Sequence, residues 1–338
     1  MKKFLVTIAL FFFIPVTILL GVYFLTDPFK TLKPFSLQYF DATNRDYLST
    51  ELFLKNYPIY QYDSYIFGSS VGCGFNTYHW LKYLPKGSRQ FIFQAWSETL
   101  TGMEQKMSYI DSTGSDIKNV ILLINDGVFS EKQLPTEALS IKDYKFSGQS
   151  KIAYQATMFW NFLQKPSFWY SSVKGKIKNS KPYIGFDTIS NDWYDTNSSV
   201  NINIQPLKDS LSNCSETVRN VFLREIATKT DADLKESPIL INDTFKEQLL
   251  HIKSIFTKHS TDYRIIVTPA YCYTHPAINK QDLKTLQDIF GEQYVFDYSG
   301  KNDLTSNCYN FSDPNHFGLS VGWQIIEDIY NNQADSLD

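Results

Sequence analysis

Short apolar segments that end in turn residues, each followed by a helix-like stretch, constrain the fold of this chain most. The clearest is Val120–Ile124, an unbroken apolar run typical of a strand whose two faces are both covered. Similar segments are about Ser64–Phe67, Gln90–Ala95, Arg264–Thr268 and Tyr294–Asp297. Alternating strands and helices form a parallel sheet between helix layers, so we predict an α/β three-layer sandwich.

Helix-like stretches alternate with these strands, and this alternation predicts where ligands bind. Between about 245 and 258, Leu249, Ile252 and Ile255 recur near helical spacing. The other expected helices are at about 76–84, 103–110, 281–289 and 319–330. Ligands of such sheets bind beyond the carboxyl ends of the strands, at the point where the strand order reverses. The segments expected to carry function are therefore 68–74, 125–129, 269–276 and 298–316.

A large insertion at about 130–240 interrupts this alternation. It contains the aromatic block Met158–Phe162, a second aromatic group at Phe168–Tyr170, and lysines that begin at Lys174. One interpretation is a lid or partner surface near a membrane, where aromatic and basic residues both fit. The simpler interpretation is the core of a small subdomain with a solvated lysine face.

The N-terminus predicts a membrane anchor. Lys2 and Lys3 precede the apolar run Phe4–Leu25, which at 22 residues is long enough to span a bilayer core of roughly 30 Å. No small-residue cleavage site follows the run, which favours an uncleaved signal anchor at residues 1–29 over a cleaved signal. The positive-inside rule then puts residues 30–338 outside the cytoplasm.

Charge and cysteine spacing exclude two classes of partner. The net charge of −3 opposes nucleic-acid binding, which usually requires a basic excess. The four cysteines form no Cys-x-x-Cys pair and no zinc-like cluster with histidine, so we expect neither a metal nor another cofactor. Disulfides and free thiols both remain open for Cys73, Cys214, Cys272 and Cys308, although Cys272 and Cys308 should lie close together.

Candidate groups for acyl transfer follow the predicted strands. The turn Gly68-Ser69-Ser70-Val71-Gly72 follows the first strand, and Asn125 ends the third. Asp313 and His316 lie three residues apart just before the last helix. Acyl transfer requires a nucleophile, a base, a group that orients the base, and donors for the oxyanion. These segments supply candidates for all four roles.

Other interpretations of the same residues remain open. Ser69 or Ser70 could cap the helix that follows, and Asp313 could cap the last helix. Asn125 could belong to an ordinary turn, and His275 is a rival base in the loop after the fourth strand. Gly68-x-Ser70-x-Gly72 also fits the nucleophile elbow of α/β-hydrolases. In that fold the elbow follows several strands, and the acid and base come from separate loops. In this chain the turn ends the first strand, and Asp313 and His316 share one loop, so that fold is disfavoured.

The pattern resembles the SGNH (GDSL-like) hydrolases. Gly68-Ser69-Ser70 is similar to their first block, and Leu123-Ile124-Asn125-Asp126 is similar to the third without its glycine. Asp313 and His316 match the fifth block fully. The second block is poorly matched: Trp96-Ser97-Glu98-Thr99 stands where a glycine is expected, and Gly102 is the nearest glycine.

The resemblance implies a flavodoxin-like sheet and a role for each matched residue. Ser70 is the implied nucleophile, His316 the base, and Asp313 the group that orients His316. The backbone N–H of Ser70 and the side-chain amide of Asn125 are the implied oxyanion donors.

A narrower resemblance, carried by the uncleaved anchor, Asp27-Pro28-Phe29 and the Gly-Ser-Ser variant, is to membrane-anchored SGNH proteins that work beside membrane-bound O-acyltransferases. It implies acetylation of exported polysaccharides or D-alanylation of teichoic acids. We therefore expect a serine esterase or O-acyltransferase that acts on acyl, especially acetyl, esters of a cell-envelope or exported polysaccharide. The alternative is a catalytically idle protein that binds glycan or docks an acyltransferase.

Overall fold

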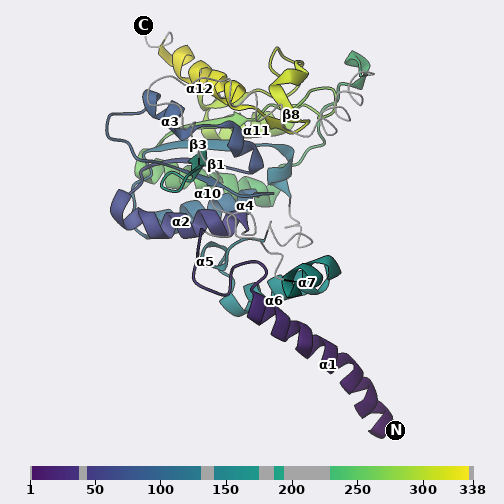
Figure 1. Cartoon of the computed structure of the whole chain (residues 1–338). Helices are drawn as coiled ribbons and strands as arrows, with labels where there is room; N and C mark the ends of the chain where they lie inside the picture. The colour runs from purple at the N-terminus through teal and green to yellow at the C-terminus, as the bar shows by residue number, and fades with distance from the viewer. Residues whose placement is uncertain (1, 38–43, 131–140, 175–185, 194–228, 335–338) are drawn as a thin grey trace. The chain divides into compact units, whose positions relative to one another are not determined.

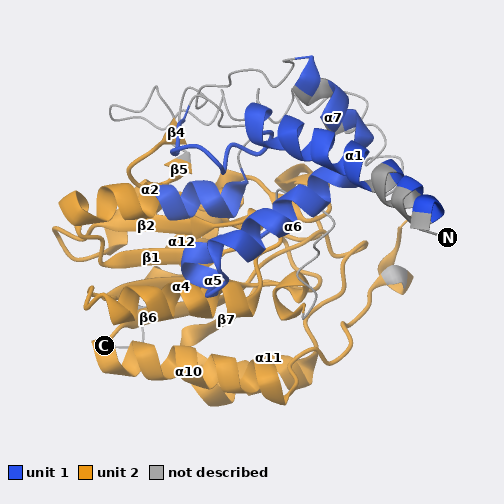
Figure 2. Ribbon diagram, turned by 90° about the horizontal axis from the view of Figure 1, so that it is seen from below, with its two compact units in different colours: residues 1–51, 132–183 blue, residues 52–131, 184–338 orange. Residues whose placement is uncertain are grey.

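The computed structural model describes residues 2–37, 44–130, 141–174, 186–193 and 229–334. Within the insertion predicted at about 130–240, residues 131–140, 175–185 and 194–228, which include Cys214, lie outside the described residues. The chain separates into two compact units (Figure 2). Unit 1 consists of residues 1–51 and 132–183, and unit 2 consists of residues 52–131 and 184–338.

Unit 2 is built on a sheet of five parallel strands in the order β2-β1-β3-β6-β7 (Figure 1). The strands are β1 (Ser64–Gly68), β2 (Gln90–Gln94), β3 (Asn119–Ile124), β6 (Asp262–Val267) and β7 (Val295–Asp297). This arrangement confirms the predicted α/β class with a parallel sheet. The order is also consistent with a flavodoxin-like fold, in which the switch point lies between the first and third strands.

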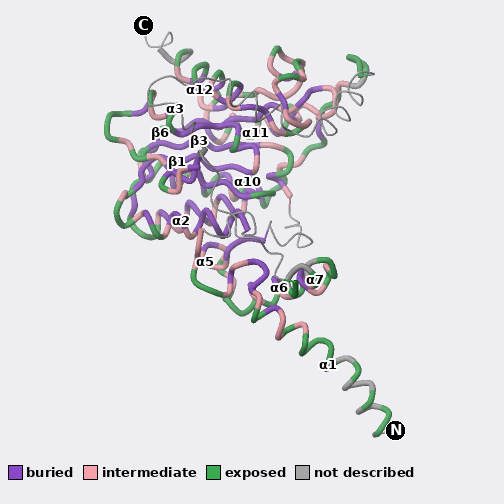
Figure 3. Tube along the Cα trace, in the orientation of Figure 1, coloured by how far each residue is buried: buried purple, intermediate pink, exposed green. Residues whose placement is uncertain are grey.

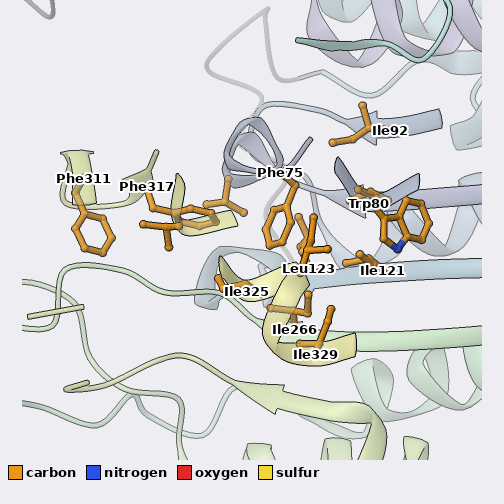
Figure 4. Close-up of a cluster of buried hydrophobic side chains, with 14 of the residues drawn as sticks. Phe75, Trp80, Ile92, Ile121, Leu123, Ile266, Phe311, Phe317, Ile325 and Ile329 are labelled. Carbon is orange, nitrogen blue, oxygen red and sulfur yellow. The ribbon is translucent and has the colours of Figure 1, made fainter. Parts of the chain in front are cut away.

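Helices cover both faces of this sheet. The side chains of each strand alternate between the two faces, so each face has side chains for helices to pack against. On one face, Ile66 and Leu123 join Trp80 and Ile325 in a buried cluster (Figure 4). The helices of this face are α3 (Thr77–Trp80) and α12 (Leu319–Ala334). On the other side lie α4 (Leu100–Ser112) and α10 (Asp243–His259), and α11 (Lys280–Phe290) packs against α10 (Figure 1).

Two predicted helices have different ends in the structure. The helix expected at about 76–84 becomes α3 and a short 3₁₀ helix, η3 (Leu81–Tyr83). Leu84 is extended because the following Pro85 disfavours a helical conformation before it. The helix expected from residue 103 begins at Leu100, because the Thr99 hydroxyl caps it by accepting the Gly102 N–H.

The remaining elements of unit 2 are short. They are the strands β4 (Phe186–Asp187), β5 (Asp192–Trp193), β8 (Phe311–Asp313) and β9 (His316–Phe317), and the 3₁₀ helices η2 (Ser70–Gly74), η4 (Asp126–Phe129), η6 (Asp231–Asp233), η7 (Glu292–Tyr294) and η8 (Cys308–Asn310). The helix α2 (Arg45–Tyr60) crosses the boundary between the two units.

Unit 1 has a core of its own. It contains α1 (Lys2–Thr26), α5 (Tyr144–Ser147), α6 (Lys151–Leu163) and α7 (Pro166–Val173). Tyr154, Met158 and Phe162 of α6 are buried together with Tyr23 and Phe29. Part of the aromatic block therefore forms the small core that the simpler interpretation expects.

The apolar run Phe4–Leu25 lies within α1. Among the described residues, none of the helices combines the length and the apolar character needed to cross a membrane. The anchor at residues 1–29 stays a prediction.

The backbones of α12 and η2 meet at two glycines. A Cβ atom on Gly322 would lie 1.8 Å from the carbonyl oxygen of Gly74, and a Cβ atom on Gly74 would lie 2.3 Å from the Phe317 ring. Only glycine permits this approach of α12 to the segment that follows β1.

We predict that Gly322→Ala destabilises unit 2 by about 1–3 kcal/mol or more, because the new methyl group meets backbone rather than a flexible side chain. Denaturant unfolding followed by far-UV circular dichroism measures the change. Gly21→Ala is the matched control, since no atom lies within 4 Å of the added methyl group and alanine favours a helix interior. Equal midpoints for the two variants would contradict the close approach.

Candidate active site

Ser70 begins the 3₁₀ helix that follows β1. The backbone leaves the strand through Ser69, whose φ and ψ are −79° and −159°, and then enters η2. The turn satisfies its own backbone groups: the Gly72 N–H donates to the Ser69 carbonyl at 3.0 Å, and the Phe75 N–H donates to Gly72 at 3.0 Å. Ser69 stands at the cap position of η2 but makes no side-chain cap hydrogen bond. The capping interpretation of this serine pair is therefore wrong for η2.

Asp313 and His316 face each other across a tight hairpin. They are paired residues of the antiparallel strands β8 and β9, joined by Pro314 and Asn315. One Asp313 oxygen accepts the backbone N–H groups of Asn315 at 2.9 Å and His316 at 3.1 Å, which is a turn-closing role typical of aspartate. The last helix begins only at Leu319, so Asp313 does not cap it.

The hairpin packs against the turn Gly68–Gly72, called the nucleophile turn here because it carries the candidate nucleophile Ser70, and a backbone bond ties the hairpin to the loop after β6. Phe317 follows His316 directly and meets Phe75 edge-on, with 5.6 Å between the ring centroids. The Tyr271 N–H donates to the Pro314 carbonyl at 2.9 Å. The hairpin is thus fixed on both sides of His316.

The structure brings Ser70, His316 and Asp313 into one hydrogen-bonded series. His316 Nε2 lies 2.8 Å from Ser70 Oγ, and His316 Nδ1 lies 2.8 Å and 2.9 Å from the two Asp313 oxygens. An ionised carboxylate only accepts hydrogen bonds, so Nδ1 carries the proton and the Nε2 lone pair faces the serine hydroxyl. This is the arrangement required of a serine nucleophile with its general base.

The surroundings of Asp313 keep its carboxyl group ionised. Burial acts to raise the pKa of Asp313, but the His316 ring and the backbone N–H groups of Asn315 and His316 donate to it. Their combined effect exceeds that of burial, so the pKa of Asp313 lies below its usual value. An ionised Asp313 can hold the His316 ring in the required orientation and stabilise its protonated form.

Asn125, the expected oxyanion donor, lies beside the nucleophile turn. It follows β3, which pairs with β1 through Phe67 and Leu122. Its side-chain amide donates to the Ser69 hydroxyl at 3.0 Å. Sequence patterns alone assign no role in the site to the buried Ser69, since only the pairing of β1 with β3 reveals its contact with Asn125.

The segment after β2 contains a residue with an uncommon backbone conformation. The Ala95 N–H donates to the Gly68 carbonyl at 3.4 Å, so this segment leaves the sheet beside the nucleophile turn. Two residues further on, Ser97 has a positive φ of 51°. Non-glycine residues adopt this conformation rarely. Gly102 lies inside α4, and its N–H is used by the Thr99 cap.

His275, the rival base, and Asp126 occupy neighbouring positions. The ring of His275 lies 3.2 Å from the Thr274 hydroxyl, and burial lowers its pKa, whereas the ring in contact with Ser70 belongs to His316. Asp126 accepts from the Ser237 hydroxyl at 2.6 Å, and burial raises its pKa. This bond ties the segment after β3 to the loop before α10.

Within the described residues no disulfide joins Cys73, Cys272 and Cys308, and Cys272 and Cys308 are free thiols. The Cys272 N–H donates to the Thr305 carbonyl at 3.1 Å, so Cys272 contacts the loop that leads to Cys308. A bridge between these two cysteines was one of the open alternatives and is absent here.

No protein-family model matches the chain, and a search of curated proteins found no match to it.

We predict that Ser69→Ala lowers kcat for a small activated acetyl ester by about tenfold. Deletion of an oxyanion donor itself typically lowers kcat by about 100- to 1,000-fold. The substitution removes the acceptor that orients the Asn125 amide, so KM should change little. Because the two residues act together, Ser69→Ala should add almost nothing to Asn125→Ala. Ser88→Ala is the control, since the Ser88 hydroxyl is exposed and bonds only to the nearby Pro85 carbonyl. Independent, multiplying effects would show that Ser69 does not position Asn125.

Proposed function

We propose that this protein is a serine esterase or O-acyltransferase of the SGNH type. The observation that carries the proposal is the series Ser70–His316–Asp313, in which both ring nitrogens of His316 lie within 2.9 Å of their partners. The flavodoxin-like strand order supports it, because Ser70 and Asn125 then flank the switch point where such folds bind ligands.

In the proposed mechanism, Ser70 Oγ attacks the acyl carbon of an ester while His316 Nε2 takes its proton. The tetrahedral oxyanion is held by the Ser70 backbone N–H and the Asn125 amide, as the resemblance implies. Collapse breaks the ester bond, and the proton on His316 passes to the leaving alcohol oxygen. Water or a sugar hydroxyl then attacks the acyl-Ser70 and gives its proton to His316, which passes that proton to Ser70 Oγ as the acyl–oxygen bond breaks, restoring free Ser70 and neutral His316.

The proposed substrates are acyl esters, especially acetyl esters, of a cell-envelope or exported polysaccharide, and a membrane-bound O-acyltransferase is the proposed partner. The proposal puts the active-site unit outside the cytoplasm with α1 as its anchor. Support comes from Lys2 and Lys3 ahead of the apolar run and from large apolar side chains that α1 leaves exposed. These are Phe4, Phe11, Phe13, Ile14, Val16, Ile18, Leu20, Phe24 and Leu25.

The second candidate is a catalytically idle protein that binds glycan or docks an acyltransferase. It is favoured by one observation, the absence of glycine from the Trp96–Thr99 segment beside Ser70. A weak oxyanion site would slow acyl transfer while leaving the glycan-binding surface intact.

We predict that the full-length protein hydrolyses a small activated acetyl ester, and that Ser70→Ala and His316→Ala each abolish this activity. The double variant should be no worse than either single variant, because members of a triad act as a unit. Initial rates with purified protein in detergent measure these effects.

The matched control is His251→Ala. His251 also pairs with an acid, since its Nδ1 lies 2.6 Å from Glu104, but it lies on the exposed face of α10. Full turnover in Ser70→Ala would contradict the mechanism. An inactive wild-type protein that still binds acetylated polysaccharide would instead favour the idle partner.

A further inference from the structure

The helix α6 of unit 1 has two opposite faces of apolar residues. Tyr154, Met158 and Phe162 are buried in the unit 1 core. On the other side, Ile152 and Trp160 are 83% and 60% exposed, eight residues apart and therefore on nearly the same side of the helix. A helix that needs only one apolar face for its own core has a second apolar face available for contact.

The helix α7 also exposes apolar side chains. Tyr170 and Val173 are 56% and 67% exposed, and the Lys174 ammonium lies 4.2 Å from the centroid of the Tyr170 ring. The indole N–H of Trp169 donates to the Phe162 carbonyl, which joins α7 to the end of α6. We call Ile152, Trp160, Tyr170 and Val173 the outer face of α6 and α7.

The helices that carry the outer face pack against α1 within the same unit. Both α6 and α7 pack against α1, and the Tyr23 hydroxyl of α1 donates to Gln155 of α6 at 2.8 Å. Figure 3 shows exposed positions along α1, and Tyr23, near the end of this helix, is buried. The apolar surface of α1 and the outer face of α6 and α7 therefore belong to one compact body.

The charge of this segment has one sign only. Residues 151–174 contain Lys151, Lys165 and Lys174 but no aspartate or glutamate, although charged residues make up 20% of the whole chain. Basic side chains beside exposed tryptophan, tyrosine and aliphatic residues are typical of helices that lie in a membrane interface and attract anionic lipids. A surface that met water alone would have no reason to exclude acidic residues.

We propose that the outer face of α6 and α7 lies in the headgroup–acyl boundary of an anionic bilayer. Trp160 and Ile152 enter the boundary, and the lysines contact lipid phosphates. The inference concerns unit 1 and does not depend on the chemistry of Ser70. It adds a second membrane contact, through the outer face of α6 and α7, to the one proposed for α1.

The test uses the full chain in phosphatidylcholine–phosphatidylglycerol vesicles whose acyl chains carry bromine near the headgroup. Bromine quenches tryptophan emission on contact, so wild-type protein should lose part of its emission. In Trp160→Phe the quenched fraction should fall by about half, because Trp160 is the indole expected at the membrane interface. Trp96→Phe is the matched control: Trp96 is 42% exposed but belongs to unit 2, and its removal should leave the quenched fraction unchanged.

Flotation of each variant with the vesicles tests membrane binding of the whole protein separately from lipid contact of the outer face. Protein that floats, with the same quenched fraction in wild type and Trp160→Phe, overturns the inference and leaves the α1 anchor standing. That result would also arise if a protein partner rather than lipid covered the outer face. Protein that does not float overturns both the inference and the proposed membrane placement, while esterase activity would still be tested by the Ser70 variants.

Discussion

The parallel pairing of β1 with β2 on one side and β3 on the other is the constraint on which the candidate site depends. Gly68 is level with Gln94, and Phe67 is level with Leu122, so the segments that leave the three strands emerge side by side. A nucleophile turn, a backbone segment with a positive φ and an amide donor are thereby assembled from residues far apart in sequence. No side chain of the site needs to reach across the sheet.

The acid and base come from a single hairpin, which makes the site depend on packing as much as on hydrogen bonds. Asp313 closes the hairpin turn with the same carboxylate that orients His316. Phe317, the next residue, is buried against Phe75 and the glycine that follows the nucleophile turn. The packing of Phe317 therefore helps to set the distance between His316 and Ser70.

The parallel sheet and the Ser70, His316 and Asp313 cluster could be predicted from sequence, because apolar strand segments and polar strand ends are local patterns. The bond from Asn125 to Ser69 could not be, since it depends on which strands become neighbours. The conformation of Ser97 could not be predicted either, because a positive φ at serine reflects tertiary constraint rather than local preference. The start of α4 differs from the sequence prediction for a local reason, because the Thr99 hydroxyl caps the helix before Leu100. The grouping of residues 1–51 with residues 132–183 in one unit could not be predicted, because it leaves no periodic pattern in the sequence.

The central claim is that Ser70 is a nucleophile activated by His316. Reaction of the full-length protein with an alkyl fluorophosphonate, followed by peptide mass spectrometry, tests it most directly because the reagent needs an activated serine and no natural substrate. We expect a single adduct on the peptide that contains Ser69 and Ser70, assigned to Ser70 by fragmentation, and its loss in His316→Ala. An adduct on another serine, or equal labelling of Ser70 without His316, would contradict it.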